Sequence, residues 1–155
     1  MTFCPGKKQR GAMSGDWNRN LVTDLEAIHT WGASVIVNLV EDHEMEDLGV
    51  ADTKRYVPAG IDYLRLSIPD FGVPDAAWEA RWATEGPLLI ERLRAGQRLL
   101  LHCKGGLGRT GMIAARLLVE MGLPAEQAIG RVRGARAGTI ETAAQEAHVR
   151  AIGRG

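Results

Sequence analysis

Short apolar runs of strand length alternate along this chain with longer segments of helical periodicity. The run SVIVNLV at 34–40 is rich in β-branched residues and LLLH at 99–102 is equally apolar, as is typical of buried strands. The run IDYLRL at 61–66 instead alternates apolar with polar residues, which predicts a strand nearer a sheet edge. Strands separated by helical segments favour a largely parallel sheet.

Between these runs, apolar residues recur at the spacing of helix turns. One such segment follows Asn20, whose side chain suits a helix N-cap. The pair Gly86 and Pro87 is expected to kink or divide the segment at 76–93. The acidic stretch 41–47 is expected to be a loop that leads into a short helix. The helices expected from the spacing cover residues 21–31, 76–93, 111–121, 124–132 and 140–152.

The length of 155 residues suits one globular domain spanning 1–155. Alternating strands and helices predict an α/β fold, with a mostly parallel central sheet flanked by helices on both faces. In such sheets, ligands bind beyond the carboxyl ends of the strands. Cys103 directly follows the strand expected at 99–102, so we expect it to lie at such an end.

The charge balance argues against a protein that mainly binds nucleic acid or an anionic membrane. Lys plus Arg and Asp plus Glu number 19 each, and the pI is about 6.9. Cys4 and Cys103 lie too far apart for a CxxC metal or redox pair. Neither a membrane-spanning run nor an apolar secretory signal is found in the sequence. We therefore expect a cytoplasmic protein without metal or other cofactor; its oligomeric state is left open.

A cysteine opens the glycine-rich segment that joins the strand at 99–102 to the next helix. Gly105, Gly106 and Gly108 permit positive φ and close backbone approach, so that successive N–H groups can surround an anion. The following helix adds the positive end of its dipole. The same donors favour a thiolate, so Cys103 is expected to be a nucleophile toward a bound phosphate group.

Side chains around these glycines complete the phosphate-handling pattern. Arg109 lies six positions after Cys103, and its planar guanidinium can grip two phosphate oxygens. Thr110 can donate a hydrogen bond to the sulfur and help it leave, whereas His102 is expected to orient and hold the loop. Lys104 adds a cation that favours a polyanionic substrate. The residues expected to bind substrate are Lys104, Gly105, Gly106, Leu107, Gly108 and Arg109. A structural turn that merely contains a buried cysteine is disfavoured by the complete HCxxGxxRT pattern.

The segment HCKGGLGRTG at 102–111 resembles the signature loop of the protein tyrosine phosphatase superfamily. The chain is most similar to the dual-specificity branch, especially the cyclin-dependent-kinase-associated phosphatases and their bacterial relatives. Shorter similarities follow in the same order, with CPG at 4–6, PD at 69–70 and at 74–75, and GTI at 138–140. The resemblance implies a dual-specificity-type cysteine phosphatase domain over 1–155 that works through a phosphocysteine intermediate.

The resemblance also implies a general acid on a loop beside the pocket. Asp70 takes the matching place, from which it would protonate the leaving oxygen and then act as a base toward water. Asp75 is the competing candidate, although it also suits the N-cap of the helix expected at 76–93. Relatives often carry a glutamine late in the domain that places the hydrolytic water. Here Glu141 stands at that position, and Gln145 is a supporting candidate.

The predicted function is hydrolysis of phosphomonoesters, on phosphotyrosine and on phosphoserine or phosphothreonine in proteins. One alternative is a phosphate-binding pseudophosphatase, and another is a phosphatase that acts on a non-protein substrate. Sulfur or arsenate chemistry is disfavoured, because rhodanese-like loops do not normally combine His102, Arg109 and Thr110 in this spacing. Cys4 is interpreted as a small buried residue. A role as the partner of an oxidised Cys103 is its alternative.

Overall fold

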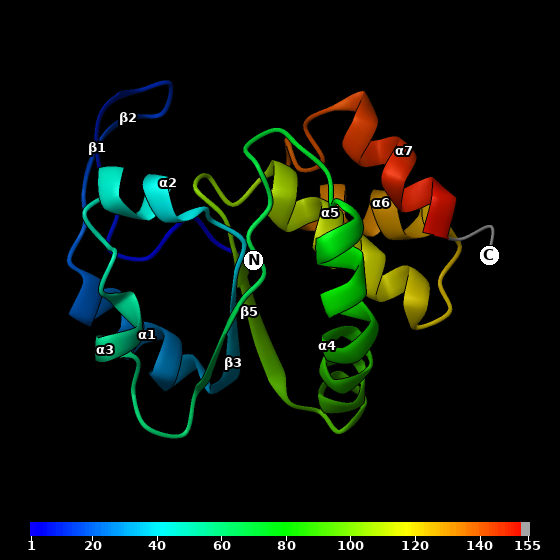
Figure 1. Cartoon of the computed structure of the whole chain (residues 1–155), viewed down its shortest axis with the longest axis horizontal. Helices are drawn as coiled ribbons and strands as arrows, with labels where there is room; N and C mark the ends of the chain where they lie inside the picture. The colour runs from blue at the N-terminus through cyan, green and yellow to red at the C-terminus, as the bar shows by residue number, and fades with distance from the viewer. Residues whose placement is uncertain (153–155) are drawn as a thin grey trace.

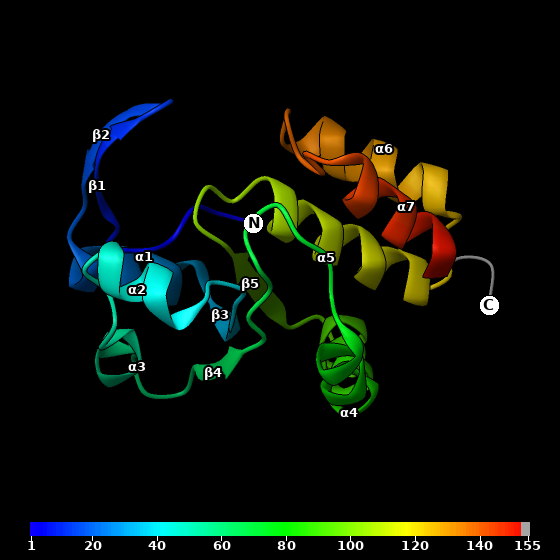
Figure 2. The same cartoon turned by 45° about the horizontal axis from the view of Figure 1, so that its top comes forward.

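The computed structural model describes residues 1–152, and its centre is a three-stranded parallel sheet of order β4–β3–β5. Figure 1 shows β3 and β5 at the middle of the molecule, and Figure 2 labels all three strands. The strands are β3 (Ala33–Asn38), β4 (Asp62–Arg65) and β5 (Arg98–His102). Residue Val37 pairs with Leu64 on one side and Leu101 on the other, so β3 is the middle strand. The mostly parallel sheet and the edge position of β4 were both predicted.

Side chains of β3 alternate between the two faces of the sheet, and each face meets its own group of helices. Val35 and Val37 join the larger core with Trp78 and Met112, whereas Ile36 joins a smaller core with Leu25. Figure 2 shows α1, α2 and α3 on one side of the sheet and α4 to α7 on the other. These helices are α1 (Leu21–Trp31), α2 (Asp42–Asp47), α3 (Thr53–Tyr56), α4 (Ala76–Arg94), α5 (Gly108–Glu120), α6 (Ala125–Ala135) and α7 (Ala143–Ile152). The α/β class with helices on both faces is therefore confirmed.

Gly86 and Pro87, which were expected to kink or divide the segment at 76–93, do not divide it, because α4 continues through both residues. Proline within a helix costs about 3 kcal/mol or more. The buried face of α4 nevertheless continues past this point, with Trp82 before it and Leu89 after it both in the larger core. A β-carbon on Gly86 would lie 2.5 Å from the indole nitrogen of Trp82, so only glycine fits beneath that ring.

Two other helices begin elsewhere than expected. Helix α5 begins at Gly108, inside the glycine-rich segment, rather than at 111. Helix α7 begins at Ala143 rather than at 140, because Ile140 has a φ of 60° that ends any helical path there. No helix within residues 1–152 is long and apolar enough to cross a membrane.

A two-stranded antiparallel hairpin near the N-terminus was not predicted. It consists of β1 (Lys8–Ala12) and β2 (Gly15–Asn18), joined by a turn at Met13 whose side chain is fully exposed. Its strands are polar and mostly exposed, so they lack the apolar alternation that identifies a strand in sequence.

Candidate active site

The Cys103 loop, residues 103–107, joins the carboxyl end of β5 to the first turn of α5. The backbone N–H of Gly106 donates to the Cys103 sulfur at 3.2 Å, so this part of the loop faces the thiol. Gly106 has a φ of 72°, and a β-carbon there would lie 2.3 Å from the carbonyl of Thr2. The sequence therefore needs glycine at this position for both its backbone conformation and its packing.

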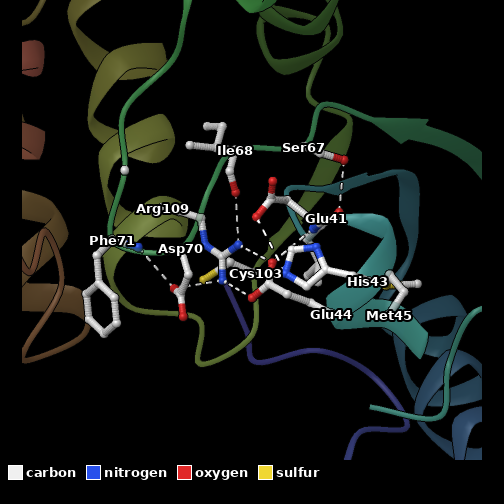
Figure 3. A network of polar contacts seen from close by, with 12 residues as sticks. Glu41, His43, Glu44, Met45, Ser67, Ile68, Asp70, Phe71, Cys103 and Arg109 are labelled. Carbon is white, nitrogen blue, oxygen red and sulfur yellow. Dashed lines mark hydrogen bonds and ion pairs between the residues drawn. The ribbon is translucent and has the colours of Figure 1, made fainter. Parts of the chain in front are cut away.

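Arg109 lies in the first turn of α5 and is almost wholly buried, with 1% of its surface exposed. Its two terminal nitrogens donate to the Glu44 carboxylate at 2.6 and 2.9 Å, and one also donates to the Ile68 carbonyl at 3.0 Å (Figure 3). Burial opposes ionisation of Glu44, but hydrogen bonds from Arg109 and from the Glu41 N–H hold its pKa below the ordinary value. The guanidinium is thus anchored by α2 and by the loop after β4.

Asp70 is the predicted acid that the structure brings to this site. Its Oδ1 lies 2.9 Å from the second terminal nitrogen of Arg109, and its side chain is 41% exposed. The Phe71 N–H donates to the same oxygen at 3.1 Å. Figure 3 shows Asp70 and Cys103 on the same side of the guanidinium. Phe71 itself has a φ of 57° and an exposed ring, a conformation that places the ring outside the core.

Asp75, the competing acid, caps α4 as predicted, with its carboxylate accepting the Trp78 N–H at 2.8 Å. Gln145 is wholly buried and both ends of its amide are in use. Its Oε1 accepts the N–H groups of Glu141 and Thr142, and its Nε2 donates to the Gly72 carbonyl at 3.3 Å. Gln145 therefore joins the turn before α7 to the loop that carries the acid.

His102 and Thr110 flank the loop at its two ends. The His102 ring is buried, its Nδ1 lies 3.4 Å from the Cys103 carbonyl, and burial lowers its pKa to about 4. It is therefore neutral at neutral pH and touches the loop backbone, which fits the holding role expected of it. The Thr110 hydroxyl is buried and has no hydrogen-bond partner within residues 1–152. The expected bond from this hydroxyl to the sulfur is thus not formed.

The other residues expected to bind substrate differ in their burial. Gly105 is exposed, Lys104 and Leu107 are half-buried, and Gly108 is buried. The carbonyl of Gly105 accepts a hydrogen bond from Arg136 at 3.3 Å. A β-carbon on Gly108 would lie 2.4 Å from a carboxylate oxygen of Glu141, so this acidic side chain packs directly on the first turn of α5.

Two charged residues at the site were not predicted, Glu44 and Lys7. Glu44 was assigned only to the acidic stretch 41–47, and Lys7 was given no role. The capping-box spacing of Glu41 and Glu44 indicates the start of a helix in the sequence, but it does not indicate that Glu44 pairs with Arg109. Glu44 and Lys7 are both buried, with 6% and 3% of their surfaces exposed.

Cys4 and Cys103 are both free thiols, and both are buried. Burial raises the pKa of Cys4 to about 12, so this thiol stays protonated at neutral pH. Within residues 1–152, no group of three or more His, Cys, Asp or Glu side chains could hold a metal ion.

Comparison with known proteins places this site in a family. The sequence profile described as "Polymorphic toxin system, DSP-PTPase phosphatase" matches residues 11–123, which include Asp70, Cys103 and Arg109. The chain belongs to this family. The resemblance to the dual-specificity branch of the protein tyrosine phosphatases is thereby confirmed.

Individual relatives agree with the family. Tyrosine-protein phosphatase CDC14 of Saccharomyces cerevisiae is 34% identical over 88 residues, which are 56% of this chain and 15% of that protein. Cyclin-dependent kinase inhibitor 3 of Rattus norvegicus is 30% identical over 141 residues, 87% of this chain and 64% of that protein. The chain thus spans less than two thirds of these curated relatives. A crystal structure of kinase associated phosphatase, with its catalytic-site cysteine replaced by serine, superposes with a TM-score of 0.81 at 28% identity. That superposition covers 95% of this chain and 80% of the other.

Proposed function

We propose that the chain is a cysteine-dependent phosphatase that hydrolyses phosphomonoesters through a phosphocysteine intermediate. The observation that carries this proposal is the grouping of a nucleophile, a cation and an acid. The Cys103 sulfur accepts a backbone N–H of its own loop, and Arg109, in the helix turn that follows, lies 2.9 Å from Asp70. Fixed N–H dipoles and a guanidinium are the groups that stabilise charge on a transferring phosphoryl group.

In the first step, the thiolate of Cys103 attacks phosphorus, and the bond from phosphorus to the leaving oxygen breaks. Asp70 gives its proton to that oxygen, so the product leaves as a neutral alcohol or phenol. Arg109 holds oxygens of the transferring group through its planar guanidinium.

In the second step, water attacks phosphorus and gives a proton to the Asp70 carboxylate. The phosphorus–sulfur bond breaks, which releases inorganic phosphate and restores the thiolate and the protonated acid. Every group in this cycle belongs to the chain or to the substrate, so no metal is required.

The proposed substrates are phosphotyrosine and phosphoserine or phosphothreonine in proteins. One relative is named a tyrosine-protein phosphatase, and the protein in the superposed crystal structure is named kinase associated phosphatase. A surface hollow of about 750 Å³ beside the loop is lined in part by Met13, Phe71 and Ile140. Such an open, partly apolar surface suits a phosphorylated side chain on a polypeptide. A cytoplasmic setting is also proposed, since Cys103 must remain a reduced thiol.

The test compares wild type with Cys103→Ser in turnover of p-nitrophenyl phosphate and a phosphopeptide panel, with EDTA present throughout. We expect turnover in wild type, loss of turnover in Cys103→Ser, and equal folding of both by circular dichroism. The matched control is Cys4→Ala, which should retain turnover. Full activity in Cys103→Ser would refute the assignment, and phosphopeptide binding without hydrolysis by wild type would favour the pseudophosphatase.

A further inference from the structure

Lys7 is a buried lysine whose nitrogen lies against the backbone of the Cys103 loop. Only 3% of its surface is exposed, and its Nζ donates to the Lys104 carbonyl at 3.3 Å. The same nitrogen lies 3.9 Å from the ring centroid of Trp17 and 5.7 Å from that of Phe3. Buried lysines are usually paired with carboxylates, yet no ion pair joins this one to an acidic residue within residues 1–152.

The segment that carries Lys7, residues 2–7, lines one side of the loop (Figure 2). Its Cys4 N–H donates to the Lys104 carbonyl at 3.2 Å, so that one oxygen accepts both the backbone N–H and the ammonium. Gly106 packs against Thr2, which belongs to the same segment. The loop backbone is thus held from this side, while the Gly106 N–H faces the sulfur.

The charged groups around Lys7 leave one candidate for its counter-ion. The titratable neighbours are Cys4, Cys103, Lys104 and Arg136. Burial lowers the pKa of Lys7, and the two neighbouring cations lower it further, so among the titratable neighbours only a thiolate would favour the ammonium. Cys4 stays protonated because its own pKa is raised to about 12. Cys103 precedes Lys104, whose carbonyl Lys7 holds, so a thiolate at Cys103 is the candidate counter-ion for the ammonium.

The positive charge of Arg109 is already engaged by acidic side chains. Arg109 is paired with Glu44 and with Asp70, so its single positive charge is already shared between two carboxylates. A thiolate at Cys103 consequently needs positive charge from elsewhere in addition to the backbone dipoles of its loop.

We propose that Lys7 is a positioning residue for the phosphatase reaction, in which its ammonium fixes the Lys104 carbonyl and stabilises Cys103 as a thiolate. The proposal rests on the proposed function, because it assigns Lys7 a role in that reaction. Lys7 acts through the loop and the sulfur and does not contact the substrate.

The direct test is the pH dependence of Cys103 alkylation by iodoacetamide, in which the thiolate displaces iodide. The rate is followed by mass spectrometry of the Cys103 peptide, so that Cys4 does not contribute. In Lys7→Met, we expect the pH midpoint to rise and the rate at pH 6 to fall roughly three- to tenfold. Lys7→Arg keeps the charge and should stay near wild type. The matched control, Lys8→Met, removes an exposed lysine next in the chain and should leave the midpoint unchanged.

Two outcomes would overturn the proposal. One is a Lys7→Met midpoint equal to that of Lys8→Met, since the ammonium would then have no effect on the thiolate. The other is an equal shift in Lys7→Met and Lys7→Arg, because loss of packing rather than of charge would explain it. Removal of a buried charge in favour of an apolar side chain is often tolerated, so we expect Lys7→Met to fold.

A second measurement needs no change at Lys7. Coupling between two titrating groups is reciprocal, so loss of the thiolate must also weaken proton binding at Lys7. We expect the NMR signal of the Lys7 side chain to titrate at lower pH in Cys103→Ser than in wild type. Identical titration in the two proteins would contradict the proposal. Neither experiment uses turnover, so a chain that shows this coupling but hydrolyses nothing would refute the proposed function alone.

Discussion

Arg109 and Glu44 form an ion pair in which both side chains are buried, with exposures of 1% and 7%. The carboxylate lies on α2 and the guanidinium in the first turn of α5, 65 positions apart in the chain. The pair has two parallel hydrogen bonds, so it fixes the plane of the guanidinium as well as its position. The orientation of Arg109 therefore depends on a helix that carries no predicted site residue.

Replacing Glu44 with glutamine should destabilise the protein and weaken catalysis together. The change keeps the side-chain shape but leaves the Arg109 charge buried without its counter-ion, which costs about 3 kcal/mol. Urea unfolding should show this loss, and kcat should fall because the guanidinium is no longer fixed. Glu46→Gln, an exposed change on the same helix, is the control. Equal stability of the two variants would show that the pair contributes nothing.

Asp70→Asn should slow turnover by about 10²–10⁴-fold on phosphoserine or phosphothreonine peptides. The effect should be smaller on p-nitrophenyl phosphate, since p-nitrophenolate leaves without needing a proton. Steady-state kinetics on the two substrates measures this difference. Asp75→Asn is the matched control, because asparagine caps a helix as well as aspartate does. If Asp75→Asn alone lost activity, the acid would be wrongly assigned.

Gly106→Ala should unfold more readily than wild type, whereas Gly105→Ala should not. Alanine at 106 adds an atom 2.3 Å from the Thr2 carbonyl and must adopt a φ of 72°, which together cost about 2–4 kcal/mol. At Gly105, a β-carbon meets nothing within 4 Å. Thermal unfolding of both variants tests the prediction. Similar midpoints for the two would mean that the contact with Thr2 is easily relieved.

The buried His102 ring should make the protein less stable in mild acid. Its pKa is lowered from 6.5 to about 4, so the unfolded chain binds more protons between these values than the folded chain does. The free energy of unfolding therefore falls as pH drops through this window, by at most about 3 kcal/mol from this residue. Glu44, whose pKa is lowered by Arg109, adds a loss at lower pH. His102→Gln should show a shallower decline in urea unfolding from pH 6.5 to 4; an unchanged slope would contradict this.

Local patterns predicted the parts of the fold that depend on neighbouring residues. The three strand runs, the Asp75 cap and the Cys103 loop were all recognised, because burial, capping and anion binding by a glycine-rich turn each act over a few residues. The helix at 76–93 was predicted, but its division at Pro87 was wrong, since packing of Trp82 and Leu89 against the core outweighs the cost of this proline.

The site residues that were missed act across long stretches of chain. Glu44 meets Arg109 only after folding, and Lys7 reaches Lys104 across 97 positions. The sequence around Glu44 and around Lys7 does not indicate which distant residue each one contacts. Gln145 was found through the resemblance, but its bond to the Gly72 carbonyl, which links it to the acid loop, depends on tertiary packing.

The Asp70 carboxylate lies against the Arg109 guanidinium where an incoming anion would also bind. A phosphate oxygen that binds the guanidinium must displace the carboxylate that already lies there, 2.9 Å away. Binding of the substrate phosphate therefore releases the Asp70 side chain from Arg109 in the same step. Once inorganic phosphate has left, the same guanidinium position is free for Asp70 again, so acid and phosphate occupy it in turn.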